Sequence, residues 1–434
     1  MIARVLLVKP PERTPRFDFG TLSLAALAAT VRRRVAVSIL DATNMDPDEA
    51  AAEAWARQPD LLGVTVMGLA SIPHAADFVR RLDAHRPVAV TGDRALIITG
   101  GHGASTIPDP LLRAGADAVV VGEGELTFQD IVAGGLRPDL AGICTLDAAG
   151  QLLKGPPRPL IARLDDLPSP ARDLIREPAD GVYLLETSRG CPHDCAFCET
   201  TRFYGRRWRP RSPERVVADI RALVYDHEAM IIMFADDNFT ASPRRVLRIC
   251  ELLGEDDVPA VFFASARGDD LIADPALLPA MARARMLRVH VGVETLDAQD
   301  AARAGKPIAP ETYRQAFTRM RELGMFSQAS MIVGLPGETP EARARAVERL
   351  VEAGPDAAQF VPFLAIPGVP MAEGLDHWEP APADVVDAAA FTAAFYRHPE
   401  TRRRLEQAAA ANDIRGTLAR GTLHRRMASD KDGS

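Results

Sequence analysis

The sequence predicts an α/β protein built from two units, each with a mainly parallel sheet covered by helices. Three observations support this prediction. Short apolar runs alternate with helical patterns in both halves, a proline-rich stretch separates the halves, and 434 residues are too many for one ordinary core. An apolar content of 47% and a charged content of 25% are typical of globular proteins.

The first unit is expected over residues 1–145. Its strand candidates are the apolar runs at 4–10, 36–42, 61–68, 95–101 and 118–125, separated by stretches with apolar residues at three- and four-residue spacing. Ligands of such sheets bind beyond the carboxyl ends of the strands. The ends here are rich in small residues, which either let a large flat ligand approach the backbone or simply form turns.

A linker is expected over residues 146–180, where prolines and acidic turns interrupt the periodicity. The second unit follows over 181–372, with strand candidates at 182–187, 230–235, 260–266, 287–294, 327–334 and 357–364. Helical patterns separate these runs. Ser212, for example, is placed to cap a helix that has Pro213 in its first turn.

Six strand–helix repeats predict a partial barrel of the triosephosphate-isomerase type, open on one side. Its chemistry should gather where the strands end. Residues 373–434 are expected to form a short helical C-terminal extension that closes in a disordered tail, "MASDKDGS".

Charge and hydropathy exclude several classes of protein. The net charge of −8 gives no electrostatic case for binding nucleic acid or an anionic membrane. No apolar run reaches the roughly 18 residues of a membrane span, and "MIARVLLVKPPE" is interpreted as a buried strand rather than a signal peptide. A cytoplasmic protein is therefore expected, in which thiols stay reduced and clustered cysteines hold metal more often than they form disulfides.

Three of the five cysteines lie within eight positions, in "CPHDCAFC", directly after the first strand of the second unit. Three thiolates from one loop can bind three irons of a [4Fe–4S] cluster and leave the fourth iron without a protein ligand, whereas a structural zinc site closes with four ligands. His193 lies inside the loop but would struggle to reach the same metal. Cys144 and Cys250 are interpreted as small buried hydrophobes. We therefore predict a working metal site at Cys191, Cys195 and Cys198.

This motif, with the aromatic Phe197 before its third cysteine, resembles the signature of the radical S-adenosylmethionine (SAM) enzymes. The resemblance implies that SAM chelates the open iron through its amino and carboxylate groups. One electron from the cluster then cleaves SAM to methionine and a 5′-deoxyadenosyl radical, which takes hydrogen from the substrate.

Four other strand ends match positions at which this family binds SAM. "FADDNF" stands where the family usually has a glycine-rich motif for the SAM amino group, although it could equally cap a helix. Glu294 is either a ribose ligand or a solvated strand-end residue, and Arg267 either meets the SAM carboxylate or pairs with a nearby aspartate. "SMIVGLPGET" resembles the adenine-binding segment, with serine in place of glycine and Glu338 one position late. The expected SAM contacts are Asp236, Asp237, Asn238, Arg267, Glu294, Ser330 and Gly334.

A Rossmann-like first unit, a linker and this motif together resemble the cobalamin-binding subfamily of radical SAM enzymes, over residues 1 to about 372. The segments "DLLGVTVMG", "ALIITGGHGAST" and "VVVGEGELTF" resemble its loops under the corrin ring. The chain lacks the Asp-x-His-x-x-Gly motif that elsewhere supplies a lower cobalt ligand, which is compatible with this subfamily. His102 fits either a neighbour of the nucleotide tail or a surface histidine. The expected cobalamin contacts are Pro10, Met67, Gly68, Gly100, Gly101, His102, Gly122, Glu123 and Gly124.

The resemblance implies methylation of an unactivated carbon, or of phosphorus, in a small metabolite through methylcobalamin. A cyclase, ring-contraction or rearrangement reaction with the same cofactors is the alternative. A cluster-binding regulator or electron carrier would form no 5′-deoxyadenosine. Methylthiotransfer to tRNA is disfavoured, because those relatives carry further N-terminal cysteines and an RNA-binding module that this chain lacks.

The reaction is expected to need a flavodoxin- or ferredoxin-type electron donor. Four arginines in "YGRRWRPRSPER" either steer an anionic substrate, dock an acidic electron carrier or form a solvated loop. No motif identifies the residues that contact the substrate or act in catalysis.

Overall fold

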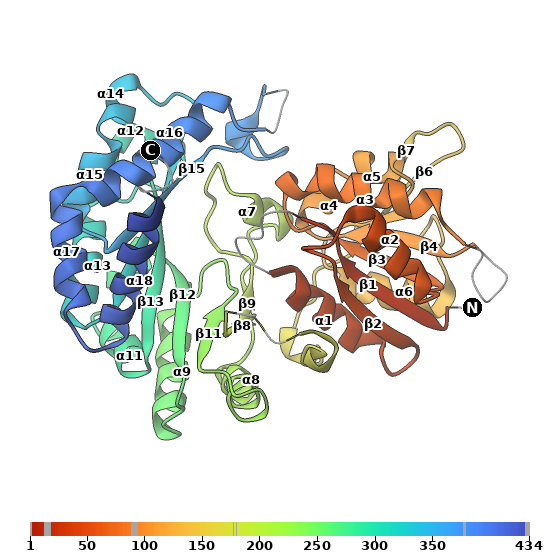
Figure 1. Ribbon diagram of the computed structural model, residues 1–434, viewed down its shortest axis with the longest axis horizontal. Helices are drawn as coiled ribbons and strands as arrows, with labels where there is room; N and C mark the ends of the chain where they lie inside the picture. Colours follow the sequence, from red (N-terminus) through yellow and green to blue (C-terminus); the bar gives the residue numbers. More distant parts are fainter. Residues whose placement is uncertain are drawn as a thin grey trace. The chain divides into compact units, whose positions relative to one another are not determined.

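The computed structural model of the chain describes residues 2–12, 19–87, 94–176, 178, 180–375 and 379–429. The chain divides into two compact units, Met1–Pro178 and Ala179–Ser434, each with a sheet of its own (Figure 1). Within the described ranges, no helix combines the length and the apolar character needed to cross a lipid bilayer.

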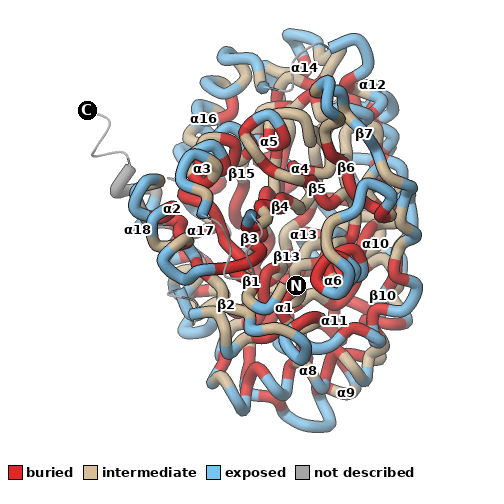
Figure 2. The backbone as a smooth tube through the Cα atoms, turned by 90° about the vertical axis from the view of Figure 1, so that its right-hand side faces the viewer, coloured by how far each residue is buried: buried red, intermediate tan, exposed pale blue. Residues whose placement is uncertain are grey.

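The first unit contains a seven-stranded sheet in the order β2-β1-β3-β4-β5-β6-β7. The first five strands of this order are parallel, whereas β6 and β7 add to the edge in antiparallel fashion. Figure 2 shows β1, β3 and β4 buried along most of their length, as expected for strands covered on both faces. β7 lies in the stretch that we expected to be a linker. The strands are β1 (Arg4–Lys9), β2 (Ala36–Asp41), β3 (Leu61–Thr65), β4 (Leu96–Gly100), β5 (Ala118–Val120), β6 (Ile143–Leu146) and β7 (Leu152–Lys154).

Helices of the first unit pack in two groups. α1 and α6 lie together over side chains of β1, β3 and β4, and α3 contacts α2, α5 and β4. α2 begins at Pro47 because the Asp46 carboxylate accepts hydrogen bonds from the amides of Asp48 and Glu49. The α-helices are α1 (Phe19–Val31), α2 (Pro47–Ala56), α3 (Ile72–Ala84), α4 (His102–Thr106), α5 (Asp109–Arg113) and α6 (Gly124–Gly134); the 3₁₀ turns are η1 (Leu69–Ser71), η2 (Leu164–Asp166) and η3 (Arg172–Leu174).

The second unit is built on six parallel strands in the order β15-β14-β13-β12-β11-β8, which confirms the predicted partial barrel. β8 and β15 are its two edges, so the barrel does not close. A short antiparallel ribbon, β9 (Ser188–Arg189) with β10 (Arg209–Pro210), follows β8. The six strands are β8 (Val182–Leu185), β11 (Ile231–Phe234), β12 (Val261–Arg267), β13 (Met286–Glu294), β14 (Phe326–Val333) and β15 (Ala357–Pro362).

Alternate residues of these strands pack under the helices that follow them. Phe262, Val291 and Met331 are buried in one cluster with side chains of α8, α9, α11, α13, α15 and α16. The opposite face of the sheet, which we call the interior face, carries the intervening residues. As predicted, the Ser212 hydroxyl caps α8 by accepting from the amide of Arg215 at 3.2 Å.

Helices of this unit have the following bounds: α7 (Glu199–Phe203), α8 (Pro213–Asp226), α9 (Pro243–Glu255), α10 (Gly268–Ala273), α11 (Leu277–Arg283), α12 (Ala298–Arg303), α13 (Pro310–Glu322), α14 (Pro340–Ala344), α15 (Ala346–Ala353), η4 (Pro370–Ala372), α16 (Pro382–Arg397), α17 (Pro399–Ala409) and α18 (Ile414–Ser429). α16 packs along β15, and α17 and α18 pack on each other and over Phe326 and Ala357, at the starts of β14 and β15. The expected disordered tail begins within α18, and residues 430–434 lie outside the described residues.

A buried carboxylate attaches α18 to the sheet. Asp356, only 1% exposed, accepts hydrogen bonds from the amide and hydroxyl of Ser327 and from Arg415 Nη2 at 2.6 Å. Removing Arg415 would leave the buried charge of Asp356 without its hydrogen-bonded cation, which costs far more than losing an exposed pair.

We therefore expect Arg415→Ala to lower the free energy of unfolding by about 3 kcal/mol, measured by urea titration. Arg314→Ala, which breaks an exposed pair with Glu311, is the matched control and should change it by less than about 1 kcal/mol. Equal effects of the two substitutions would contradict the role given to Asp356.

Candidate functional site

The three clustered cysteines lie on a loop that follows β9 and ends at α7, near the carboxyl ends of the six strands. Cys195 is buried, and Cys198 is the residue before the first turn of α7. Backbone hydrogen bonds hold the middle of the loop: the Ala196 amide donates to Ala304 O at 2.9 Å, and the Met371 amide donates to Ala196 O at 3.0 Å. The thiols are therefore presented by a fixed backbone.

Asp237 joins the two ends of this loop. Its carboxylate accepts from the Gly190 amide at 3.1 Å and from the Thr200 hydroxyl at 2.8 Å, one residue before the first cysteine and two after the last. Burial raises the pKa of Asp237 to about 6, so the group is mainly ionised at neutral pH. The neighbouring Asp236 accepts at both oxygens from Thr187 and Ser188, which ties the loop to the end of β8.

The donor set fits an iron–sulfur cluster. All three thiols are free of disulfides. Among the residues that the structure describes, no three histidine, cysteine or acidic side chains gather around one point where a single ion would bind. A [4Fe–4S] cluster does not require this, because each thiolate binds a different iron. Burial raises the pKa of each thiol, that of Cys191 to about 11, so deprotonation would accompany binding of the positively charged irons.

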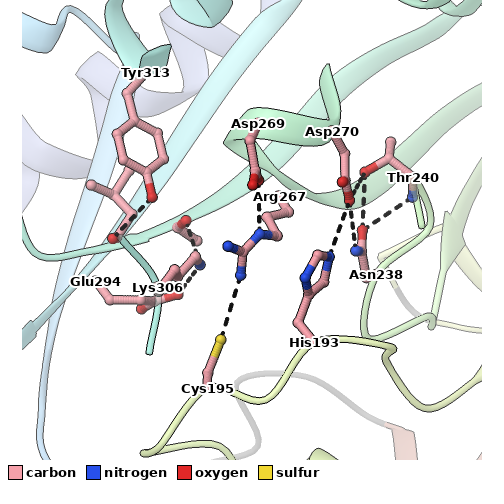
Figure 3. A network of polar contacts seen from close by, with 12 residues as sticks. His193, Cys195, Asn238, Thr240, Arg267, Asp269, Asp270, Glu294, Lys306 and Tyr313 are labelled. Atoms are coloured by element: carbon pink, nitrogen blue, oxygen red, sulfur yellow. Dashed lines mark hydrogen bonds and ion pairs between the residues drawn. The ribbon is translucent and has the colours of Figure 1, made fainter. Parts of the chain in front are cut away.

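A cationic contact lies beside the buried thiol (Figure 3). Arg267, the last residue of β12, places Nη1 3.5 Å from Cys195 Sγ and donates through Nε to Asp269 at 2.7 Å. The sequence left open whether Arg267 meets the SAM carboxylate or pairs with a nearby aspartate, and in the structure it pairs with Asp269. It also faces the thiol, where its charge would stabilise a thiolate.

Lys306 is a second cation at this site, and no motif in the sequence indicated it. It is 8% exposed, donates to Gly292 O at 2.8 Å and pairs with Glu294 at 3.1 Å. Glu294 ends β13 with φ +67°, a strained backbone for a non-glycine residue. A Cβ at Gly292 would meet the Glu294 carboxylate and the Lys306 ammonium group, so a larger residue there would displace this ion pair. The Tyr313 hydroxyl donates to Val293 O at 3.3 Å and supports the same turn.

Asn238 belongs to a polar network on the side of Arg267 opposite to Lys306 and Glu294 (Figure 3). Its amide donates to Asp270 at 2.8 Å, and its oxygen accepts from the amide and hydroxyl of Thr240. His193, from the cysteine loop, lies 3.9 Å from the same Asp270 carboxylate. "FADDNF" therefore has its polar groups largely engaged within the protein, which is the behaviour of a structural turn.

The segment after β14 is fixed by an ion-pair network. The Gly334 amide, at φ +84°, donates to Glu338 at 3.0 Å. Arg343 then pairs with Glu338 and with Asp384 and Asp387 of α16. Glu338, which stands one position later than in the family's adenine-binding segment, thus closes the turn. Ser330 lies on the interior face, 6% exposed, and its hydroxyl makes no hydrogen bond to any described residue.

The basic stretch after the cysteines is only half exposed. Arg209 and Arg211 are buried, Arg209 against the ring of Tyr204, whereas Arg206 and Arg207 are exposed. Arg206 also pairs with Asp194. The four arginines are therefore not one solvated patch.

In the first unit, the glycines at the strand ends differ in what surrounds them. A Cβ at Gly101 would lie 2.6 Å from Val66 O, and one at Gly103 would lie 2.5 Å from Gly68 O, so these two glycines serve close packing inside the protein. A Cβ at Gly68 or Gly122 would meet no atom of a described residue within 4 Å. Among the described residues, nothing therefore covers the backbone at these two positions, beyond β3 and β5.

Some of the other expected cobalamin contacts make hydrogen bonds within the protein. Glu123 is buried and accepts from the Ile161 amide at 2.7 Å, while the Gly122 amide donates to the Ser105 hydroxyl at 3.1 Å. Pro10 is buried; Met67, Gly100, His102 and Gly124 are partly exposed. Glu123 therefore holds the turn after β5 in place, while the backbone at Gly68 and Gly122 stays partly exposed.

Two family descriptions match the chain. The B12 binding domain matches residues 12–132, and the radical SAM superfamily matches residues 185–350.

Several curated relatives are methyltransferases. An uncharacterized methyltransferase of Pyrococcus horikoshii is 31% identical, over 85% of this chain and 82% of its own. Cytidylyl-2-hydroxyethylphosphonate methyltransferase of Streptomyces wedmorensis is 28% identical, over 84% of this chain and 79% of its own. An anaerobic magnesium-protoporphyrin IX monomethyl ester cyclase of Rubrivivax gelatinosus is 27% identical, over 75% of this chain and 60% of its own.

Two solved structures share the fold. The radical SAM methyltransferase TsrM of Kitasatospora setae, with tryptophan and a SAM analogue bound, has a TM-score of 0.71 at 20% identity, covering 85% of this chain and 75% of that one. The cobalamin-dependent SAM radical enzyme OxsB, with aqua-cobalamin bound, has a TM-score of 0.67 at 21% identity, covering 86% and 55%.

Cys195→Ala should abolish the near-ultraviolet absorbance of the reconstituted cluster and the cleavage of SAM, because one of three iron ligands is lost. Cys250→Ala is the matched control, since that thiol is buried between helices of the same unit. Cluster and SAM cleavage retained in Cys195→Ala would remove this residue from the site.

Gly68→Trp should prevent cobalamin uptake, measured from bound cobalt, while leaving the iron content unchanged. Gly68 has φ −136°, which any residue adopts, and open space where the side chain would project. Gly101→Ala is the contrasting variant: it should lower the stability of the first unit through its contact with Val66. Full cobalt binding by Gly68→Trp would place the ligand elsewhere.

Proposed function

We propose that this chain, which belongs to the cobalamin-binding radical SAM enzymes, methylates an unactivated carbon or, as a second choice, phosphorus of a small metabolite. The observation that carries the proposal is one loop with three thiols, beside the strand ends of an open six-stranded barrel, in a chain that also has a B12 binding domain. Two methyltransferases, of which this chain covers 82% and 79%, support transfer of a methyl group.

The cofactors supply the reactive chemistry: the reduced cluster generates a radical from SAM, and cobalamin carries a methyl group. The protein binds and orients them. Cys191, Cys195 and Cys198 would hold the cluster. Asp237 keeps their loop closed, and Arg267 and Lys306 place two positive charges near Cys195.

For SAM itself, the proposed contacts lie close to the ends of β13 and β14. Glu294 could accept from ribose hydroxyls, Ser330 offers a hydroxyl without a partner among the described residues, and the turn at Gly334 would meet the adenine. Asp236 and Asn238 are engaged in hydrogen bonds within the protein, so we assign them to shaping the turn that SAM contacts.

A cyclase reaction with the same cofactors is the second candidate, and the Rubrivivax relative favours it. We rank it lower because the chain spans 60% of that relative but 82% and 79% of the two methyltransferases. We further propose a cytosolic location and a flavodoxin- or ferredoxin-type electron donor, since the cluster must be reduced and its thiols kept from oxidation.

Reconstitution under anaerobic conditions with iron, sulfide and hydroxocobalamin, followed by counting of bound metals, comes first. The expected ratio is about four irons to one cobalt. The loaded protein is then given a reductant, a metabolite extract and SAM with a deuterated methyl group. Label in a product, together with 5′-deoxyadenosine, is the expected result. Formation of 5′-deoxyadenosine with an unlabelled product would favour the cyclase reaction, and its absence would overturn radical SAM turnover on those metabolites.

A further inference from the structure

Core side chains fill only one end of the interior face of the second sheet. Along β12, β13 and β14, residues that point toward the helices are buried, and most of the intervening residues are partly exposed. The exceptions at the start of the strands are Phe263 and Phe326, which are buried, Phe326 under α17 and α18. A closed barrel of this type fills its interior with packed side chains. Here most of the face stays partly exposed, and it carries the polar side chains Ser265, Arg267, Arg288, His290, Glu294, Gln328 and Ser330.

Arg288 stands out on this face because no described residue is its counter-ion. It lies near the start of β13, beside Phe263 and Phe326 in the register. Its guanidinium sits 5.0 Å from the centroid of the Phe263 ring and donates to Gln328 Oε1. Both partners are neutral, and no carboxylate of a described residue pairs with it. By contrast, Arg267, on the same face, has Asp269.

A second cation lies on the helix that covers this end of the face. α18 packs over Phe326, the register neighbour of Arg288, and carries Arg425. Burial lowers the pKa of Arg288, and the charge of Arg425 lowers it further. Arginine nevertheless stays protonated at neutral pH. Two guanidinium groups near each other, one of them largely desolvated, are unfavourable unless an anion lies between or beside them.

Hydrogen-bonding groups connect this position to the strand ends. Ser265, His290 and Gln328 are neighbours in the register two residues above Arg288, and Gly292 follows between Arg267 and Ser330. The Ser265 and Ser330 hydroxyls make no hydrogen bond to any described residue. Gly292 lies four positions after Arg288 along β13, a distance of about 13 Å.

We propose that Arg288, with Gln328 and Arg425, binds an oxyanion group of the substrate, either phosphoryl or carboxyl. This inference deepens the proposed function, because it names the substrate class of the same site: an elongated metabolite with an anionic end. A guanidinium recognises both groups through paired, charge-assisted hydrogen bonds. The polar groups of Ser265 and His290 then face the body of the molecule, which extends toward the strand ends.

The test uses the full-length protein loaded with cluster and cobalamin, and the probes are inorganic phosphate and acetate. Binding is followed by the rise in the unfolding temperature, with chloride keeping the ionic strength constant, and by the broadening of the phosphorus resonance. One probe or both should bind, and Arg288→Gln should weaken binding at least about tenfold. Tighter binding of phosphate would identify a phosphoryl group, and tighter binding of acetate a carboxyl group.

Arg314→Gln is the matched control, because it removes one exposed guanidinium from the same unit and should leave binding unchanged. If Arg288→Gln binds as much iron as the unaltered protein, it folds. If it does not, Arg425→Gln, at an exposed position, replaces it and should also weaken binding. Absence of binding by the unaltered protein, or equal binding by Arg288→Gln and Arg314→Gln, would overturn the proposal.

The labelled-methyl experiment separates this inference from the proposed function. If the protein transfers the methyl group but Arg288 does not contribute to binding either anion, the oxyanion subsite is wrong and the methyl transfer stands. Anion binding that depends on Arg288, in a protein that forms an unlabelled product, would keep the subsite and overturn the methyl transfer.

Discussion

Asp237 is the side chain on which the candidate site most depends. Its buried carboxylate binds both ends of the cysteine loop, through the Gly190 amide and the Thr200 hydroxyl. Because a buried carboxylate is unfavourable without donors, the loop ends and the aspartate stabilise each other. The thiols are thereby held near the strand ends before any metal arrives, which lowers the conformational entropy lost on cluster binding.

Positive charge is concentrated where negative charge must be accommodated. Three thiolates and a SAM carboxylate would all lie near one end of the barrel, and the positive charges of Arg267 and Lys306 act on Cys195. Both are held by carboxylates, so they are fixed in place and partly neutralised. Arg288, further down the interior face, has only neutral partners among the described residues. Within the part of the chain that the structure describes, the face therefore carries a cation without a carboxylate partner at the end away from the cluster.

In the first unit, the important feature is backbone at the strand ends that side chains do not cover. Of the glycines that the sequence placed at the strand ends, Gly101 serves internal packing, while Gly68 and Gly122 have no neighbour within contact distance of a Cβ. A broad apolar ring gains from close approach to such backbone, because dispersion contacts fall off steeply with distance.

The sequence by itself determined the two parallel sheets, all six strands of the second unit and the cysteine loop. Apolar periodicity and cysteine spacing are local properties, so they can be read from neighbouring residues. Only the tertiary structure decided the partners: Arg267 with Asp269 and Cys195, Lys306 with Glu294, and Arg288 with no charged partner among the residues described. Such pairings join strands far apart in the chain, and whether a charge is satisfied depends on which elements the fold brings together. For the same reason Lys306, which follows α12 without a motif, gave no signal before the fold was known.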